Sequence, residues 1–214
     1  MTKPRNVYWD SCVFYCLLTG KPPQHQIDVL EILSDARSGS AKIYCSTITY
    51  AEIRQQFLRP KGHLTIGDFF KDLGSAVVTI DPNPNIMIAA GELRDAEPTN
   101  PSDATTLNKR SVGIADAIHL QTCLYLRDVM GVRDIEFQTF DAGKGKTWEG
   151  RCVPLLGFER WFPEATRTKR VRDVCAMSRK LPKSAQASLF NLEFVNTSMP
   201  AITDESSLVD KPAQ

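Results

Sequence analysis

The chain has 214 residues, of which 42% are hydrophobic and 24% charged, so it can bury a core and is not wholly disordered. Its 26 basic and 25 acidic residues give a net charge of +1, which excludes a surface that is positively charged throughout and binds nucleic acid in that way. No apolar run approaches the roughly 18 residues of a membrane span. Asp10 interrupts the start before the apolar core of a secretory signal forms. We therefore expect a cytoplasmic protein with no membrane contact.

The alternation of short apolar runs and helical periodicity predicts an α/β fold. In chain order we expect strand 6–10, helices 11–20 and 25–37, strand 42–46, helices 49–58 and 63–74, strand 76–80, helices 85–96 and 113–131, and strands 135–140 and 152–156. Residues 97–110 are polar, contain two prolines and are typical of a long surface loop. Strands that alternate with helices favour a central parallel sheet covered on both faces, in a three-layer α/β/α arrangement.

The composition changes after Leu156. Residues 160–183 contain eight Lys or Arg and two acidic residues, whereas residues 184–214 contain one Lys and four acidic residues. We therefore divide the chain into a domain of residues 1–156 and a basic, then acidic, C-terminal extension of residues 157–214. Its last ~20 residues are rich in Ser, Thr, Pro and acids, which predicts poor order.

The six cysteines include no Cys-x-x-Cys pair. A structural zinc site needs pairs of closely spaced ligands, and the three histidines lie far apart in the chain. Because Cys12, Cys45 and Cys123 lie in apolar stretches, the pattern favours reduced and buried thiols.

Acidic residues stand where expected strands end or the following helices begin. Asp10 ends the first strand, Glu52 lies in the helix after the second, and Asp116 lies in the first turns of helix 113–131. Asp141 follows strand 135–140. Ligands of an open α/β sheet bind outside the carboxyl ends of its strands, so we expect the four carboxylates to meet there. Close carboxylates repel one another unless a cation neutralises them, and oxygen ligands suit Mg²⁺ or Mn²⁺.

Each of these acids also has a structural interpretation. Asp10 can cap the helix that follows it, and Glu52 fits a capping box with Thr49. Asp116 can favour the helix dipole, and Asp141, before Ala-Gly, can hold an Asx turn. Only the coincidence of four acids in these places favours a metal site.

The runs VYWDSCVF, STITYAEI, IADAIHLQTCL and FQTFDAGKGK resemble the motifs of the PIN-domain nucleases, over residues 5 to about 155. The family's four acidic positions match Asp10, Glu52, Asp116 and Asp141. Thr139 matches the family's hydroxyl residue two places before the last acid, and Ser11 lies where the family often has Ser or Thr. Two features depart from a minimal PIN domain, namely the longer loop 97–110 and the presence of residues 156–214.

The resemblance implies a PIN-like α/β/α fold and a Mg²⁺- or Mn²⁺-dependent endoribonuclease, often the toxin of a toxin–antitoxin pair. It implies that Asp10, Asp116 and Asp141 bind the metal directly or through water, and that Glu52 binds it or orients the attacking water. Thr139 and Ser11 would then support these groups from a second layer. The ion would screen the phosphodiester and lower the pKa of a bound water. The resemblance also suggests a homodimer and an antitoxin that blocks the cleft.

Basic residues outside the acidic cluster are candidate RNA contacts. Lys144 and Lys146 lie in DAGKGKT, which is not a phosphate-binding loop because Phe140 stands where its spacing requires Gly. The stretch after residue 156 adds Trp161 and Phe162 for base stacking, together with the cations Arg167, Lys169, Arg170 and Arg172. The alternative interpretation of this stretch is a solvated helical or loop face.

Two other functions stay open at this point. One is an RNA-binding or regulatory module that keeps the fold without cutting, and the other is a structure-specific DNA nuclease with the same chemistry. We expect His119, one turn after Asp116, to pack or to meet solvent on the helix flank rather than to take part in catalysis.

Overall fold

The structure is a computed structural model that describes residues 3–98, 110–142 and 152–185. Residues Met1–Ser184 form one compact unit and residues Ala185–Gln214 a second. Most of the predicted loop 97–110, Lys144, Lys146 and the C-terminal segment predicted to be poorly ordered lie outside the described residues. Within the described ranges, no helix combines the length and apolar character needed to cross a membrane.

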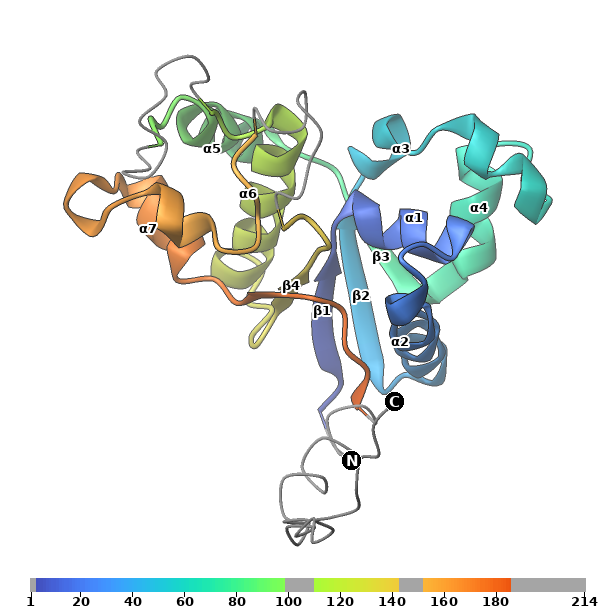
Figure 1. Cartoon of the computed structure of the whole chain (residues 1–214). Coiled ribbons are helices and arrows are strands. Elements are labelled where there is room, and N and C mark those ends of the chain that lie inside the picture. Colours follow the sequence, from blue (N-terminus) through green and yellow to red (C-terminus); the bar gives the residue numbers. More distant parts are fainter. Residues whose placement is uncertain (1–2, 99–109, 143–151, 186–214) are drawn as a thin grey trace, which may run out of the picture. The chain divides into compact units, whose positions relative to one another are not determined.

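In the described part of the chain, five parallel strands form one sheet in the order β3-β2-β1-β4-β5 (Figure 1). Their bounds are β1 Arg5–Trp9, β2 Ala41–Ser46, β3 Val77–Ile80, β4 Glu136–Gln138 and β5 Arg179–Lys180. The chain adds β2 and β3 on one side of β1, and later β4 and β5 on the other side. The strand order therefore reverses next to β1, and such a reversal opens a crevice at the carboxyl ends of the strands.

Seven α-helices are described, and they surround this sheet. Helices α1 (Ser11–Thr19), α2 (Gln26–Ser38) and α4 (Ile66–Leu73) lie on one side, and α5 (Pro84–Arg94), α6 (Ile114–Asp128) and α7 (Lys169–Cys175) on the other (Figure 1). The short α3 (Thr49–Glu52) follows β2. Short 3-10 segments are Pro23–His25, Gln55–Phe57, Arg59–Lys61, Gly74–Ala76, Phe158–Trp161 and Glu164–Thr166.

Both faces of the sheet are buried under helices. Successive side chains of a strand point to opposite faces, so neighbouring residues belong to different cores. Val7 and Trp9 belong to the core under α1, α2 and α4, whereas Tyr8 belongs to the core under α5, α6 and α7. A strand covered on both faces needs apolar residues at consecutive positions, which explains the run Val7, Tyr8, Trp9. The α/β/α fold expected from the sequence is therefore present.

Local sequence sets the ends of the helices. The Asp10 side chain caps α1, and Thr65 and Asp68 form a reciprocal capping box at the start of α4. Gly20 and Gly39 end α1 and α2 in the left-handed conformation, with φ of 70° and 83°. Gly is favoured there because a residue with a Cβ adopts this conformation at a cost.

Two predicted elements are wrong. The helix expected at 49–58 stops at Glu52, because Ile53 is extended, with φ −73° and ψ 115°. The strand expected at 152–156 is absent, and only an isolated bridge joins Cys152 to Ser111. Pro154 has no N–H to donate to a ladder, and β5 occupies the sheet edge beside β4 instead.

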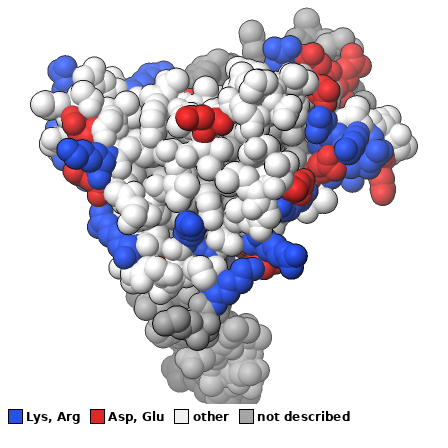
Figure 2. Space-filling view, turned by 180° about the vertical axis from the view of Figure 1, so that it is seen from behind, with Lys and Arg blue, Asp and Glu red and all other residues white. Residues whose placement is uncertain are grey.

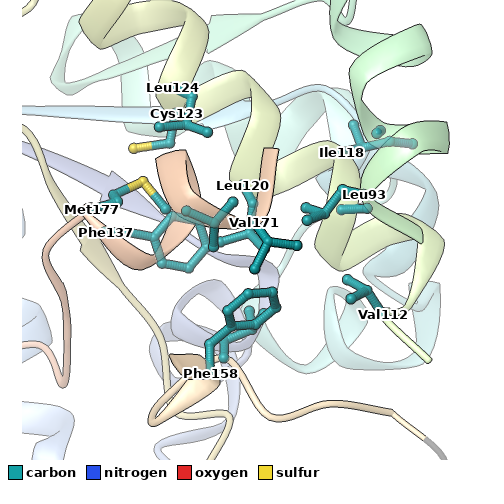
Figure 3. Close-up of a cluster of buried hydrophobic side chains, with 14 of the residues drawn as sticks. Leu93, Val112, Ile118, Leu120, Cys123, Leu124, Phe137, Phe158, Val171 and Met177 are labelled. Carbon is teal, nitrogen blue, oxygen red and sulfur yellow. The ribbon is translucent and has the colours of Figure 1, made fainter. Parts of the chain in front are cut away.

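The compact unit also continues well past the predicted boundary at residue 156. Phe158, Val171 and Met177 are buried in the same core as Leu120 of α6 and Phe137 of β4, and point toward them (Figure 3). The compact unit ends at Ser184, so residues 157–184 belong to the domain rather than to an extension. The excess of basic residues concealed the contribution of this segment to the core, because its buried apolar side chains alternate with exposed charged ones.

Candidate active site

Four acidic residues approach the carboxyl edge of the sheet from four elements. Asp10 follows the central strand β1, Glu52 ends α3, and Asp116 lies in the first turn of α6. Asp141 follows β4, the strand beside β1. The charges of Asp10, Asp141 and Glu52 all act to raise the pKa of Asp116, so the fold brings the four carboxylates close enough to interact electrostatically.

Asp10 is buried and held at both carboxylate oxygens. Its Oδ1 accepts a hydrogen bond from the backbone N–H of Ser11 at 2.6 Å, and its Oδ2 accepts one from the Thr139 hydroxyl at 2.7 Å. Only 5% of Asp10 is exposed. The bond to Ser11 is the cap of α1. Asp10 therefore has both roles that the sequence allows, as a helix cap and as a member of the acidic site.

Thr139 joins the ends of the two central strands. Its hydroxyl donates to Asp10 and accepts from the backbone N–H of Asp141 at 3.0 Å. Oδ2 of Asp141 in turn accepts from the backbone N–H of Leu155 at 3.1 Å. These bonds position Asp141 relative to Asp10.

Cys12 also borders this site. Its thiol lies 3.2 Å from Asp10 Oδ2 and 3.3 Å from the Thr139 hydroxyl, and Cys12 is half-buried rather than fully buried as expected. Burial and the Asp10 charge raise the pKa of the Cys12 thiol well above its usual value, so the group stays a protonated thiol. All six cysteines are free, in agreement with the reduced state expected from the sequence.

His119 lies inside the site, which the sequence did not predict. Its Nε2 is 2.8 Å from Glu52 Oε2, 3.0 Å from the Ser11 hydroxyl and 3.6 Å from Asp10 Oδ1. Its Nδ1 is 2.9 Å from the Tyr8 hydroxyl. The His119 side chain is fully buried, so it does pack, but it packs against the acids rather than on a solvated flank. The signal in the sequence was its position three residues after Asp116, which places both on neighbouring parts of one helix face.

Glu52 and His119 form a compensated pair. Burial acts to raise the pKa of Glu52, but the hydrogen bonds and charge of His119 and the bond from Ser11 outweigh it and lower the pKa. Burial acts to lower the pKa of His119, but Glu52 and Asp10 outweigh it and raise the pKa. Glu52 does not form the capping box expected as its alternative role, because its Oε2 accepts from Ser11 at 2.5 Å and contacts His119.

The carboxylate of Asp116 is only partly compensated by its surroundings. Burial, followed by the charges of Asp10 and Asp141, raises its pKa to about 7, against a partial offset from His119. Gly113, which precedes α6, makes room for this carboxylate. A Cβ at position 113 would lie 2.3 Å from Asp116 Oδ2, so any larger residue would displace it.

The donor chemistry of the site fits a hard divalent cation, because most of its polar side chains are carboxylates and hydroxyls. Burial, followed by the charges of Asp10 and Asp141, raises the pKa of Asp116, and a bound cation would favour the charged carboxylate again. Among the described residues, however, no three His, Cys, Asp or Glu side chains form a group that could hold a metal ion. The oxygen donors are thus near one another without forming a ready-made coordination shell.

Most of the predicted RNA contacts after residue 156 have structural partners. Arg167 donates to the Phe162 carbonyl at 2.8 Å, Arg170 pairs with Glu92 at 2.6 Å, and Arg172 donates to the Arg167 carbonyl at 3.0 Å. Lys169, the first residue of α7, forms no salt bridge with a described residue.

The two aromatic residues predicted to stack on bases differ in their surroundings. Phe162 is 2% exposed and packs in the core, so its predicted role in base stacking is wrong. Trp161 is half-buried, and the centroid of its ring lies 4.4 Å from Cζ of the Arg110 guanidinium. On the face seen in Figure 2, basic and acidic side chains lie mainly toward the margins of a broad uncharged area, and the basic ones do not form a continuous field.

Comparison with known proteins identifies the fold family. The PIN domain family model matches residues 7–142, a range that includes all four acids, Ser11 and Thr139. The chain belongs to the PIN-domain family. PIN domains are generally nucleases, hydrolases that typically use divalent metals, so this chain has a nuclease fold. A search of curated proteins found no match.

Proposed function

We propose that this PIN-domain protein is a Mg²⁺- or Mn²⁺-dependent endoribonuclease that hydrolyses RNA phosphodiesters by attack of water. The observation that supports this most is the convergence of Asp10, Glu52, Asp116 and Asp141 at the point where the strand order reverses. An RNA-binding module that does not cut has no need to bury Asp116 near other carboxylates, where burial and then their charges raise its pKa.

The residues divide into two groups by their contacts. Asp10, Asp116 and Asp141 would hold the ion, which when bound screens the phosphate charge and lowers the pKa of a water. Glu52 keeps its negative charge, because the pKa of its carboxyl is lowered, and it can accept a hydrogen bond from the attacking water. His119 and Ser11 hold the Glu52 carboxylate in place, and Thr139 holds Asp10.

The test is cleavage of single-stranded RNA with Mn²⁺ or Mg²⁺, with and without a chelator. We expect cleavage that the chelator abolishes, and a loss of at least about 100-fold in Asp116→Asn because a charged group of the site is removed. Asp95→Asn is the matched control, because Asp95 is an exposed carboxylate that pairs with Arg94 after α5.

Absence of metal-dependent cleavage in the wild type, or full cleavage by a clean Asp116→Asn preparation, would reject the proposal. Single-stranded DNA in the same assay separates an RNA nuclease from a DNA nuclease. The homodimer, the toxin role and an antitoxin partner are further proposals that rest on the family resemblance, and sedimentation of the purified chain tests the first of them.

A further inference from the structure

A hollow lies among helices α5, α6 and α7, and none of the four acids lines it. Its volume is about 340 Å³. Ile86, Ala89 and Leu124 form an apolar lining, and each of them is 5% exposed or less. A hollow of this size with an apolar lining holds one small ring system or a short side chain.

A buried amide lines this hollow without a hydrogen bond. Gln121 of α6 is 4% exposed, and its Nε2 has no hydrogen-bond partner among the described residues. Burying a donor without an acceptor costs its desolvation free energy, so such groups are rare in folded proteins. A ligand that brings a carbonyl oxygen to Gln121 would recover that cost, whereas a wholly apolar ligand would not.

Charged groups of both signs complete the lining. Arg170 and Asp128 are already paired with Glu92 and Arg127. Lys169 and Asp173 also line the hollow, and neither forms a salt bridge with a described residue. The lining therefore includes Lys169 and Asp173, which form no salt bridge with a described residue, and Gln121, whose Nε2 has no hydrogen-bond partner among those residues.

A nucleotide matches this set of groups. Its base is planar and stacks on apolar or aromatic surface, its ring carbonyls accept from amides, and its exocyclic amino groups donate to carboxylates. Its phosphate would lie against an ammonium group such as Lys169. Phosphate alone fits poorly, because Asp128 and Asp173 would repel it. Lys169 and Arg170 are also two of the cations for which the sequence predicts contact with RNA.

We propose that this hollow binds one unpaired nucleotide of RNA, with Gln121 donating a hydrogen bond to the base. The inference rests on the proposed action on RNA and deepens it. A base-reading site apart from the four acids would give the protein a sequence preference that the carboxylates themselves do not provide, because they act on the phosphodiester backbone, which is common to all sequences.

The experiment measures binding of AMP, CMP, GMP and UMP to the full-length chain by calorimetry without divalent metal, with ribose 5-phosphate as the probe that lacks a base. We expect at least one nucleotide to bind at least about fivefold more tightly than ribose 5-phosphate, and Gln121→Leu to lose that preference. Gln56→Leu is the matched control, because Gln56 is exposed and does not line the hollow.

Stability provides the check that the variant folds. Gln121→Leu removes an unpartnered buried amide, so its melting temperature should equal or exceed that of the wild type while nucleotide binding falls. If Gln121→Leu does not fold, Lys169→Met gives a second variant at the surface, and it should weaken nucleotide binding and its dependence on salt.

The inference is overturned if no nucleotide binds better than ribose 5-phosphate, or if folded Gln121→Leu binds nucleotides as the wild type does. Cleavage of RNA by the wild type is measured separately. Cleavage without nucleotide preference rejects the nucleotide site alone. Nucleotide preference without cleavage supports the site and rejects the proposed nuclease activity.

Discussion

A Cβ at position 113 would lie 2.3 Å from Asp116 Oδ2, so the carboxylate of Asp116 depends on the absence of a side chain at Gly113. The backbone itself does not demand glycine there, because its φ is −58°. The need for glycine is therefore a matter of space beside one functional group rather than of chain conformation.

Gly113→Ala should reduce RNA cleavage by at least about tenfold, because the Asp116 carboxylate must move away from its position. The measurement is cleavage rate together with melting temperature. Gly91→Ala is the control, because a Cβ at this position in α5 meets no atom within 4 Å. That change should stabilise the helix by about 0.5–1 kcal/mol and leave cleavage unchanged. Equal cleavage by both variants would contradict the steric argument.

Asp116 also makes the stability of the metal-free protein depend on pH. Its pKa is about 7 in the folded chain, against about 3.9 for an ordinary Asp. Between these values the folded chain holds a proton that the unfolded chain has lost, so the contribution of Asp116 to stability falls as pH rises. Asn carries no charge and escapes this effect.

Urea unfolding at pH 5 and pH 8 without divalent metal tests this dependence. Relative to the wild type, Asp116→Asn should gain roughly 1–3 kcal/mol in unfolding free energy between the two pH values. The raised pKa of His119 removes stabilisation as pH rises in both proteins, so the comparison largely cancels that contribution. Stability curves that stay parallel would show that the pKa of Asp116 is not raised in the folded chain.

His119 connects four elements, because it contacts Tyr8 of β1, Ser11 of α1 and Glu52 of α3 from its place in α6. His119→Gln should lower the unfolding free energy by about 1–3 kcal/mol, since it disturbs buried hydrogen bonds to Tyr8 and Glu52. The control is His63→Gln, whose partner Asp72 is 69% exposed and whose ion pair should contribute at most about 1 kcal/mol. Chemical denaturation measures both, and equal losses would contradict the role of the buried network.

At the scale of elements, the segment after residue 156 is part of the fold. β5 pairs with β4, and α7 packs Val171 and Val174 into the core beneath α6. Arg179 of β5 donates to the Leu155 carbonyl at 3.0 Å and pairs with Glu159 at 2.7 Å. The basic side chains of this segment thus lie over an apolar inner surface.

Truncation distinguishes the two domain boundaries. A chain that ends at Ser184 should keep the melting temperature of the full-length protein. A chain that ends at Leu156 should fail to fold cooperatively, because it loses β5 and exposes the surface that Phe158 and Val171 cover. Circular dichroism during heating measures both. A folded chain of residues 1–156 would contradict the assignment of β5 and α7 to the core.

At the scale of the whole molecule, the alternating strands and helices could be predicted from the sequence, because short apolar runs and helical periodicity are both local patterns. The short apolar runs predicted β1 and β2, and Asp10 was recognised as a possible cap of the helix that follows it. The order of the acids along the chain, set against the ends of the expected strands, was enough to predict that they gather at one edge of the sheet.

By itself, then, the sequence determined the fold class, most of the elements and the acids at the strand ends, because these follow from side-chain periodicity and from the rule that parallel strands end at one edge. Only the tertiary structure decided that His119 compensates Glu52, that Phe162 is buried and that β5 closes the sheet beside β4. Those features depend on contacts between segments distant in the chain, where packing rather than local pattern sets which side chain meets which.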